Sequence, residues 1–254
     1  FNSSDCDGIL GPKTWARMKQ LLSNTNSIQV SPSLPSGTPP TIENTFEFNR
    51  WHAEKILENM NTGFVGQSFQ SKEQLEKISR GETVNLLNPN NHIIQALPII
   101  HHIAESAKKE DYKEIIIGSF IRGADKKGAC TGHCAGRCID LNISSRSFES
   151  VAALQMVVRI LGYLTNLPDK YKKSMGFGMP LQGQFFGHQN LTKYKGVSTT
   201  LLKNEELRKL VNQLGYVFPD NDNHLHIQFN WLSKSASNYE TEVVYEEGES
   251  YKNS

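Results

Sequence analysis

The chain lacks an excess of charge of either sign. Its 254 residues include 27 basic and 26 acidic side chains, so the formal net charge is +1. Proteins that bind polyanions through their charge carry a clear basic surplus, and we therefore expect no nucleic acid partner. The sequence also lacks an apolar run of the roughly 18 residues that a membrane span needs. Its apolar runs, such as Ile115 to Ile117, are typical of buried strands, and we expect no membrane span.

Cysteine is scarce, and the HExxH motif of the commoner zinc peptidases is absent. A metal site would therefore have to be assembled from separate segments. Three of the four cysteines lie close together, at Cys130, Cys134 and Cys138, but without the CxxC pairs of zinc ribbons. Two interpretations stay open, a structural Cys/His zinc site that includes His133 or a disulfide such as Cys130 with Cys134. A disulfide would require an oxidising compartment.

Composition divides the chain into four segments. Residues 1–22 carry turn signals followed by a short amphipathic helix, and residues 23–44 hold four of the ten prolines and predict a linker. Residues 45–232 have the composition of a globular domain, and residues 233–254 predict a polar, acidic tail. Because the chain opens with Phe1, we expect a mature product or a piece of a longer protein.

Hydrophobic periodicity within the main domain predicts alternating helices and strands. The predicted helices cover residues 50–60, 93–108, 151–164 and 204–214, and the predicted strands cover residues 112–121, 137–143 and 224–229. This pattern predicts an α+β fold, with a small antiparallel sheet that carries a metal site and is flanked by helices. The segment 165–203, rich in glycine, lysine and glutamine, is expected to form loops that wall the substrate site.

Two distant segments carry the residue types that ligate zinc. His133 lies in a glycine-flanked turn, and Asp140 lies in an apolar strand, where a buried carboxylate needs a cationic or metal partner. His224 and His226 would point to one face of a strand, because side chains alternate with period two. Three ligands, His133, Asp140 and His226, would leave a fourth position for a water that zinc acidifies. His224 would stand beside it for proton transfer or oxyanion stabilisation.

This pattern, His-x6-Asp followed by His-x-His, resembles that of the LAS group of zinc peptidases. The group comprises lysostaphin-type enzymes, D-Ala-D-Ala metallopeptidases and murein endopeptidases, and the segments 132–140 and 222–227 are most similar to the murein endopeptidase branch. The resemblance implies that His133, Asp140 and His226 bind Zn²⁺ and that His224 is the catalytic histidine. It also implies that Arg122 binds a substrate carboxylate or the developing oxyanion, for which a guanidinium is suited.

The chain departs from that branch at three positions. Cys130 and Asn221 stand where the murein endopeptidases carry further histidines, and Cys138 stands where a small residue such as alanine or valine is expected. These differences leave the three ligands intact and concern the details of substrate binding. Asp220 and Asp222 are candidates to orient His224.

The segment from Asp5 to Met18 resembles the second half of the common peptidoglycan-binding module, with its Asp-Gly-Ile and Gly-Pro-x-Thr core. Together the two resemblances imply a zinc-dependent peptidoglycan hydrolase that cleaves an amide bond of the peptide stem or cross-link. A zinc N-acetylmuramoyl-L-alanine amidase and a non-catalytic, zinc-stabilised wall-binding module are the alternatives. We expect an extracytoplasmic location. The protein would act there as a housekeeping enzyme, a phage lysin or a delivered antibacterial effector.

Overall fold

The computed structural model describes nine stretches of the chain, residues 40–67, 69–123, 132–143, 147–148, 150–172, 175–180, 184–186, 201–220 and 223–232. The chain divides into two units, residues 1–37 and 38–254, and the described residues belong to the second. The predicted module at 1–22, most of the predicted linker at 23–44 and the predicted tail at 233–254 lie outside the described residues.

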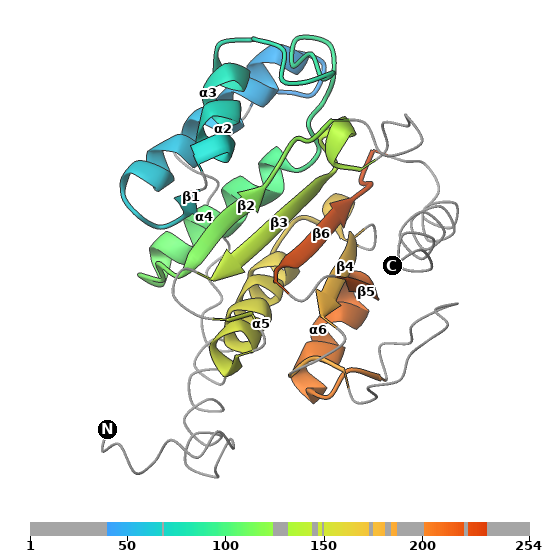
Figure 1. The fold of residues 1–254 in the computed structure, drawn as a ribbon. Coiled ribbons are helices and arrows are strands. Elements are labelled where there is room, and N and C mark those ends of the chain that lie inside the picture. Colours follow the sequence, from blue (N-terminus) through green and yellow to red (C-terminus); the bar gives the residue numbers. More distant parts are fainter. Residues whose placement is uncertain are drawn as a thin grey trace. The chain divides into compact units, whose positions relative to one another are not determined.

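A six-stranded sheet forms the middle of this unit, in the order β1-β2-β3-β6-β4-β5 (Figure 1). Its strands are β1 (Gly66–Gln67), β2 (Ile115–Ser119), β3 (Cys138–Ile143), β4 (Met175–Pro180), β5 (Gly215–Asp220) and β6 (Leu225–Phe229). The four inner strands pair antiparallel, whereas β1 with β2 and β4 with β5 pair parallel. The predicted α+β class is confirmed, but the sheet is mixed and not purely antiparallel. The reason is that β4 and β5 are joined by a helical crossover, which returns the chain in the same direction.

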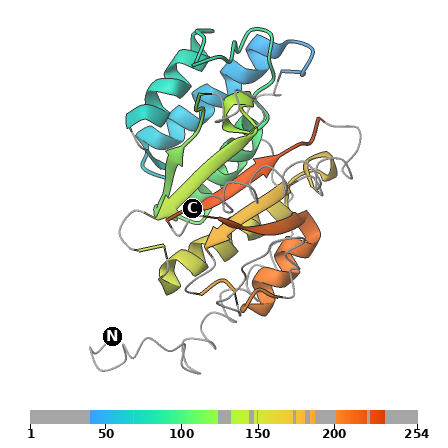
Figure 2. The ribbon, with the colours of Figure 1, turned by 45° about the vertical axis from the view of Figure 1, so that its right-hand side comes forward.

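Five described helices surround the sheet, namely α2 (Thr45–Asn61), α3 (Phe69–Ser79), α4 (Leu97–Lys109), α5 (Val151–Thr165) and α6 (Glu205–Leu214). Three begin at capping side chains, because Asn44, Ser150 and Asn204 each accept a hydrogen bond from a backbone amide three residues on. Helices α5 and α6 cover one face of the sheet, while α2 and α3 pack together beside β1 and β2 (Figures 1 and 2). None of the described helices is both long and apolar enough to cross a bilayer.

Helix α3 was not predicted, because polar residues interrupt its buried stripe. Its inner face carries Ser71, Gln74, Leu75 and Ile78, which follow the helical spacing although only two of them are apolar. The Gln74 side-chain amide donates to the carbonyl of Ile121 at 2.6 Å and accepts from the amide of Ile121 at 3.0 Å. These bonds satisfy the buried amide group, so it is tolerated inside the domain.

Strand β4 corrects the expectation that residues 165–203 form loops. Met175, Phe177 and Met179 are fully buried in the hydrophobic core, and the glycines between them face the opposite side of the sheet. A Cβ added at Gly176 would come within 2.6 Å of the Tyr216 ring, so the glycine leaves space that this ring occupies. Glycine that signals a loop in the sequence therefore belongs here to a strand. Residues 187–200 lie outside the described residues.

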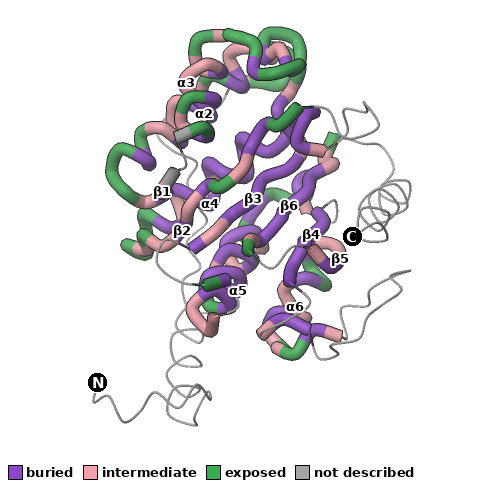
Figure 3. Tube along the Cα trace, in the orientation of Figure 1, coloured by how far each residue is buried: buried purple, intermediate pink, exposed green. Residues whose placement is uncertain are grey.

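The strands that carry the predicted site are buried along almost their whole length (Figure 3). On the helix-covered face, Ile139 and Leu141 of β3 and Ile227 of β6 join the core that also contains the apolar side of α5. Removing each such side chain from water stabilises the fold by roughly 1.5–3 kcal/mol. The opposite face of the same strands is left for polar side chains, and the candidate site lies there.

Candidate metal centre

His133 is held by a short turn at the start of β3. The 3-10 helix η2 (His133–Ala135) lies between Gly132 and Gly136, and Gly136 has φ = 66°, in the left-handed region that favours glycine. The Nδ1 atom of His133 lies 2.6 Å from the carbonyl oxygen of Phe120. Because a carbonyl can only accept, Nδ1 must carry the proton and Nε2 presents its lone pair. Such an anchored tautomer is typical of metal-ligating histidines.

Asp140 is the centre of the candidate site. Strand register places it directly opposite His226, on the neighbouring strand β6. Its Oδ1 atom lies 2.9 Å from Nδ1 of His226, 3.2 Å from Nε2 of His133 and 3.4 Å from Nε2 of His224. Three imidazole rings from two segments nearly ninety residues apart in sequence therefore converge on one carboxylate oxygen, and the side chain of Asp140 is only 8% exposed. The structure brings together all four residues that the sequence predicted for the zinc site.

His224 lies at the edge of this cluster, one residue before β6, and its side chain is half-buried. Besides Asp140, its Nε2 atom approaches Oδ2 of Asp220 at 3.5 Å, and its Nδ1 atom lies 2.5 Å from the side-chain oxygen of Asn223. Of the two candidates to orient His224, Asp220 therefore lies beside it, whereas Asp222 is outside the described residues. Asp220 also lies 3.8 Å from Nδ1 of His226, so this carboxylate faces both histidines.

Arg122 approaches the cluster from the chain that follows β2. Its Nη2 atom lies 3.5 Å from Oδ2 of Asp140, whereas the contacts of the three histidines are with Oδ1. The side chain is 54% exposed. Arg122 therefore contacts the cluster at its Asp140 carboxylate and is also reached by solvent.

Burial and charge set the protonation states in the cluster. Burial opposes ionisation of Asp140, but contacts from His133 and His226 outweigh it and hold the pKa of Asp140 well below its usual value. Burial lowers the pKa of His133 below its usual value, and the Asp140 carboxylate opposes that shift without reversing it. At neutral pH the carboxylate is therefore ionised and the His133 imidazole neutral, which are the states that bind a metal ion.

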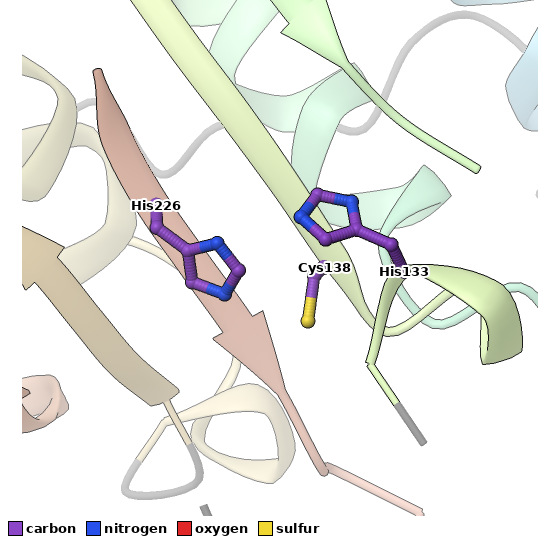
Figure 4. Close-up of side chains that lie close together, drawn as sticks. All are labelled: His133, Cys138 and His226. Carbon is purple, nitrogen blue, oxygen red and sulfur yellow. The ribbon is translucent and has the colours of Figure 1, made fainter. Parts of the chain in front are cut away.

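Two groups of three side chains in the described part of the chain have ligating atoms within 4.8 Å of one another. They are His133, Cys138 and His226, drawn in Figure 4, and Asp140, His224 and His226. These buried groups can hold a metal ion, and the predicted ligand set takes its members from both. The Nε2 atom of His133 is buried and makes no hydrogen bond with protein, as expected of an atom that a cation would satisfy.

Cys138 is the residue that the main interpretation of the sequence missed. The sequence analysis includes Cys138 only in a structural site built from Cys130, Cys134 and Cys138 with His133. Cys134 is disulfide-bonded, which rules that site out. The disulfide expected at Cys134 is thereby confirmed, while Cys130 lies outside the described residues. A signal for Cys138 was available, since it precedes Asp140 by two residues on one strand and so shares its face.

The described residues thus present imidazole, carboxylate and thiol groups in two clusters that share His226. The functional argument rests on this geometry and on the sequence motifs that produce it. Comparisons of the chain with protein-family models, with curated proteins and with solved structures find no match.

Proposed function

We propose that the protein is a zinc-dependent hydrolase of the LAS type that cleaves an amide bond in the peptide stem or cross-link of peptidoglycan. The observation that carries the proposal is the convergence of three imidazole rings within 3.4 Å of one buried carboxylate oxygen. A purely structural ion pair needs one cation for one carboxylate. Three histidines around one aspartate, with burial lowering the pKa of His133, instead match the composition of a metal site.

The donor set favours zinc among the common divalent ions. Imidazole nitrogen with carboxylate oxygen is a borderline set that suits zinc, whereas calcium and magnesium prefer all-oxygen shells. In this proposal His133, Asp140 and His226 hold the ion. Zinc held by three protein ligands supplies Lewis acidity and lowers the pKa of a water toward neutrality.

The chain's own side chains supply the remaining functions. His224 is the most exposed of the three histidines, and its Nε2 lies between the carboxylates of Asp140 and Asp220. Because His224 lies at the more exposed edge of the cluster, its imidazole is suited to accept a proton and return it to a leaving amine. Arg122, whose side chain is about half exposed, is suited to bind a substrate carboxylate or a developing oxyanion.

Two further features support peptidoglycan as the substrate class. The N-terminal segment resembles half of a peptidoglycan-binding module, and such modules deliver wall hydrolases to their polymer. The disulfide at Cys134 is consistent with an oxidising, extracytoplasmic compartment, where that polymer is found. Peptide stems also carry free carboxylates, which Arg122 is able to bind.

Digestion of purified peptidoglycan tests the proposal. The wild type, His133→Ala and His224→Ala are compared by mass spectrometry of the products and by metal analysis of each protein. We expect new termini from the wild type alone, with zinc lost in His133→Ala and largely retained in His224→Ala. The exposed His92→Ala is the matched control and should keep both zinc and activity, because only its backbone carbonyl is used in the fold.

The products also separate the alternatives. New termini within the peptide indicate an endopeptidase or carboxypeptidase, whereas release of whole stems from the sugar indicates an amidase. Bound zinc without products from any wall type would reject the enzyme and leave a zinc-stabilised binding module. Absence of zinc from the wild type would reject the metal site itself.

A further inference from the structure

A thiol lies beside the histidines of the candidate metal centre. Cys138 begins β3 and shares its face with Asp140, because side chains alternate along the strand. The residue is 1% exposed and is not disulfide-bonded. Its Sγ atom lies within 4.8 Å of ligating nitrogens of both His133 and His226, and Figure 4 shows the three side chains directed toward one another from η2, β3 and β6.

A second observation points to a ligand at the same place. His133 is 92% buried, since its exposed fraction is 8%, and its Nε2 atom makes no hydrogen bond with protein. The polar atom beside it is Oδ1 of Asp140 at 3.2 Å, and a carboxylate oxygen accepts hydrogen bonds, as an unprotonated Nε2 also does. Because Nδ1 already donates to Phe120, Nε2 is a buried acceptor, and leaving such an atom unsatisfied costs about 1–3 kcal/mol. A bound cation removes that penalty.

The surrounding backbone leaves room for the sulfur atom. A Cβ added at Gly132 would lie 3.2 Å from Sγ of Cys138, which is closer than an unstrained contact. The glycine before His133 therefore accommodates the thiol as well as the turn. On β6, the residue opposite Cys138 is Gln228, so the thiol faces a polar side chain and not the apolar core.

We propose that Cys138 is a metal ligand and that His133, Cys138 and His226 form a nitrogen–nitrogen–sulfur set for borderline-soft divalent cations such as Zn²⁺, Co²⁺ and Cd²⁺. On binding, the thiol loses its proton to solvent and the thiolate takes its place in the coordination shell. The inference rests on the proposed function only in using the same two histidines. His226 also belongs to the set with Asp140 and His224, so thiolate and carboxylate compete for one ion. A sulfur ligand shifts that competition toward softer metals.

Cobalt titration of the metal-free full chain tests this ligand set, without reductant so that the Cys134 disulfide stays intact. Bound Co²⁺ gives visible d–d bands from any tetrahedral site, and a thiolate ligand adds a sulfur-to-cobalt charge-transfer band in the near ultraviolet. We expect both features in the wild type and in His224→Ala, which alters only the other set. In Cys138→Ser the near-ultraviolet band should vanish, and Co²⁺ affinity should fall about 10- to 100-fold. Mutation of a residue that only orients a metal ligand already lowers affinity by this amount.

The outcomes separate this inference from the proposed function. Two outcomes would overturn the role of Cys138 as a ligand without contradicting the metal centre. One is that the wild type shows visible bands but no near-ultraviolet band. The other is that the near-ultraviolet band persists in Cys138→Ser. If the wild type shows neither the visible bands nor the near-ultraviolet band, both the role of Cys138 and the proposed metal centre are overturned. X-ray absorption of the zinc-loaded wild type needs no variant, and it should show a sulfur scatterer at about 2.3 Å. A shell of nitrogen and oxygen alone would refute the inference even if Cys138→Ser failed to fold.

Discussion

A buried pair of histidines away from the candidate metal centre makes the domain sensitive to acid. His52 of α2 and His101 of α4 place their Nδ1 atoms 3.0 Å apart, so one ring donates and the other accepts. Both side chains are buried. Burial lowers the pKa of His101 to about 4, with Glu105 opposing that shift, and burial and the neighbouring His101 hold the pKa of His52 well below its usual value. The fold therefore holds both rings neutral at physiological pH.

The loss of folding stability that His101 causes at low pH follows from its pKa. A histidine in the unfolded chain has a pKa near 6.5, and each unit of difference corresponds to about 1.4 kcal/mol. Because the folded-state pKa is lower, the unfolded state binds more protons between the two values, and stability falls as pH falls. The full stability is present above about pH 6.5 and is lost as pH drops toward about 4. The difference of about 2.5 units predicts a loss on the order of 3 kcal/mol from His101 alone.

Urea unfolding of the metal-free protein at a series of pH values measures this loss. The variant His101→Asn keeps a side-chain amide near the position of Nδ1, so it can still pair with His52 but does not titrate. We expect the free energy of unfolding of the wild type to fall by on the order of 3 kcal/mol more than that of His101→Asn between about pH 7 and pH 4. Parallel pH curves for the two proteins would refute the reasoning, since they would mean that His101 titrates normally in the fold.

Two further predictions concern single residues. Asn49→Ala removes three hydrogen bonds of a buried side chain, to the carbonyls of residues 89 and 92 and from the amide of Ile94. It should lower the free energy of unfolding by about 3 kcal/mol, as measured by urea unfolding. Equal stability of Asn49→Ala and the exposed Asn91→Ala would contradict this prediction. Gly136→Ala places a side chain at positive φ and within 2.9 Å of Ile94, so it should lower the free energy of unfolding by about 2 kcal/mol or more. It should also weaken Co²⁺ binding, because it moves the adjacent turn that carries His133. The control is Gly162→Ala in a helix, where the added Cβ meets nothing within 4 Å. This substitution should be neutral or should raise the free energy of unfolding by up to about 1 kcal/mol. A similar loss of stability in Gly136→Ala and Gly162→Ala would show that positive φ is not the cause.

Residue type and strand alternation were sufficient to predict most of the candidate centre. His133 and Asp140 could be identified because a polar pair in an apolar, glycine-flanked segment is costly without a partner. His224 and His226 followed from period-two alternation next to a buried strand. The contact between Asp140 and His226 could not be derived in the same way, because it depends on β3 and β6 being neighbours in the sheet. Local sequence does not encode that choice of partner.

Two of the elements that escaped prediction, α3 and β4, share a physical cause. In α3 the polar Gln74 replaces apolar residues on the buried face and is satisfied by the backbone of Ile121. In β4 alternating glycines mimic a loop, although they leave space that the rings of Tyr216 and Phe218 occupy. Each case depends on a tertiary contact that supplies what the local sequence lacks. Helices with continuous apolar stripes, such as α5, were predicted almost to the residue.

The position of β6 determines when in folding the candidate site can exist. This strand comes after all the other described strands in sequence yet lies between β3 and β4, and its contact with Asp140 spans 86 residues. Closing so long a loop is slow, and it must precede any coordination by His226. A nascent chain emerging from the ribosome therefore presents β3 with one side unpaired, and its carboxylate without its partner histidine, until the residues of β6 have been synthesised. Any metal coordination that uses His226 would consequently be a late event, tied to completion of the sheet.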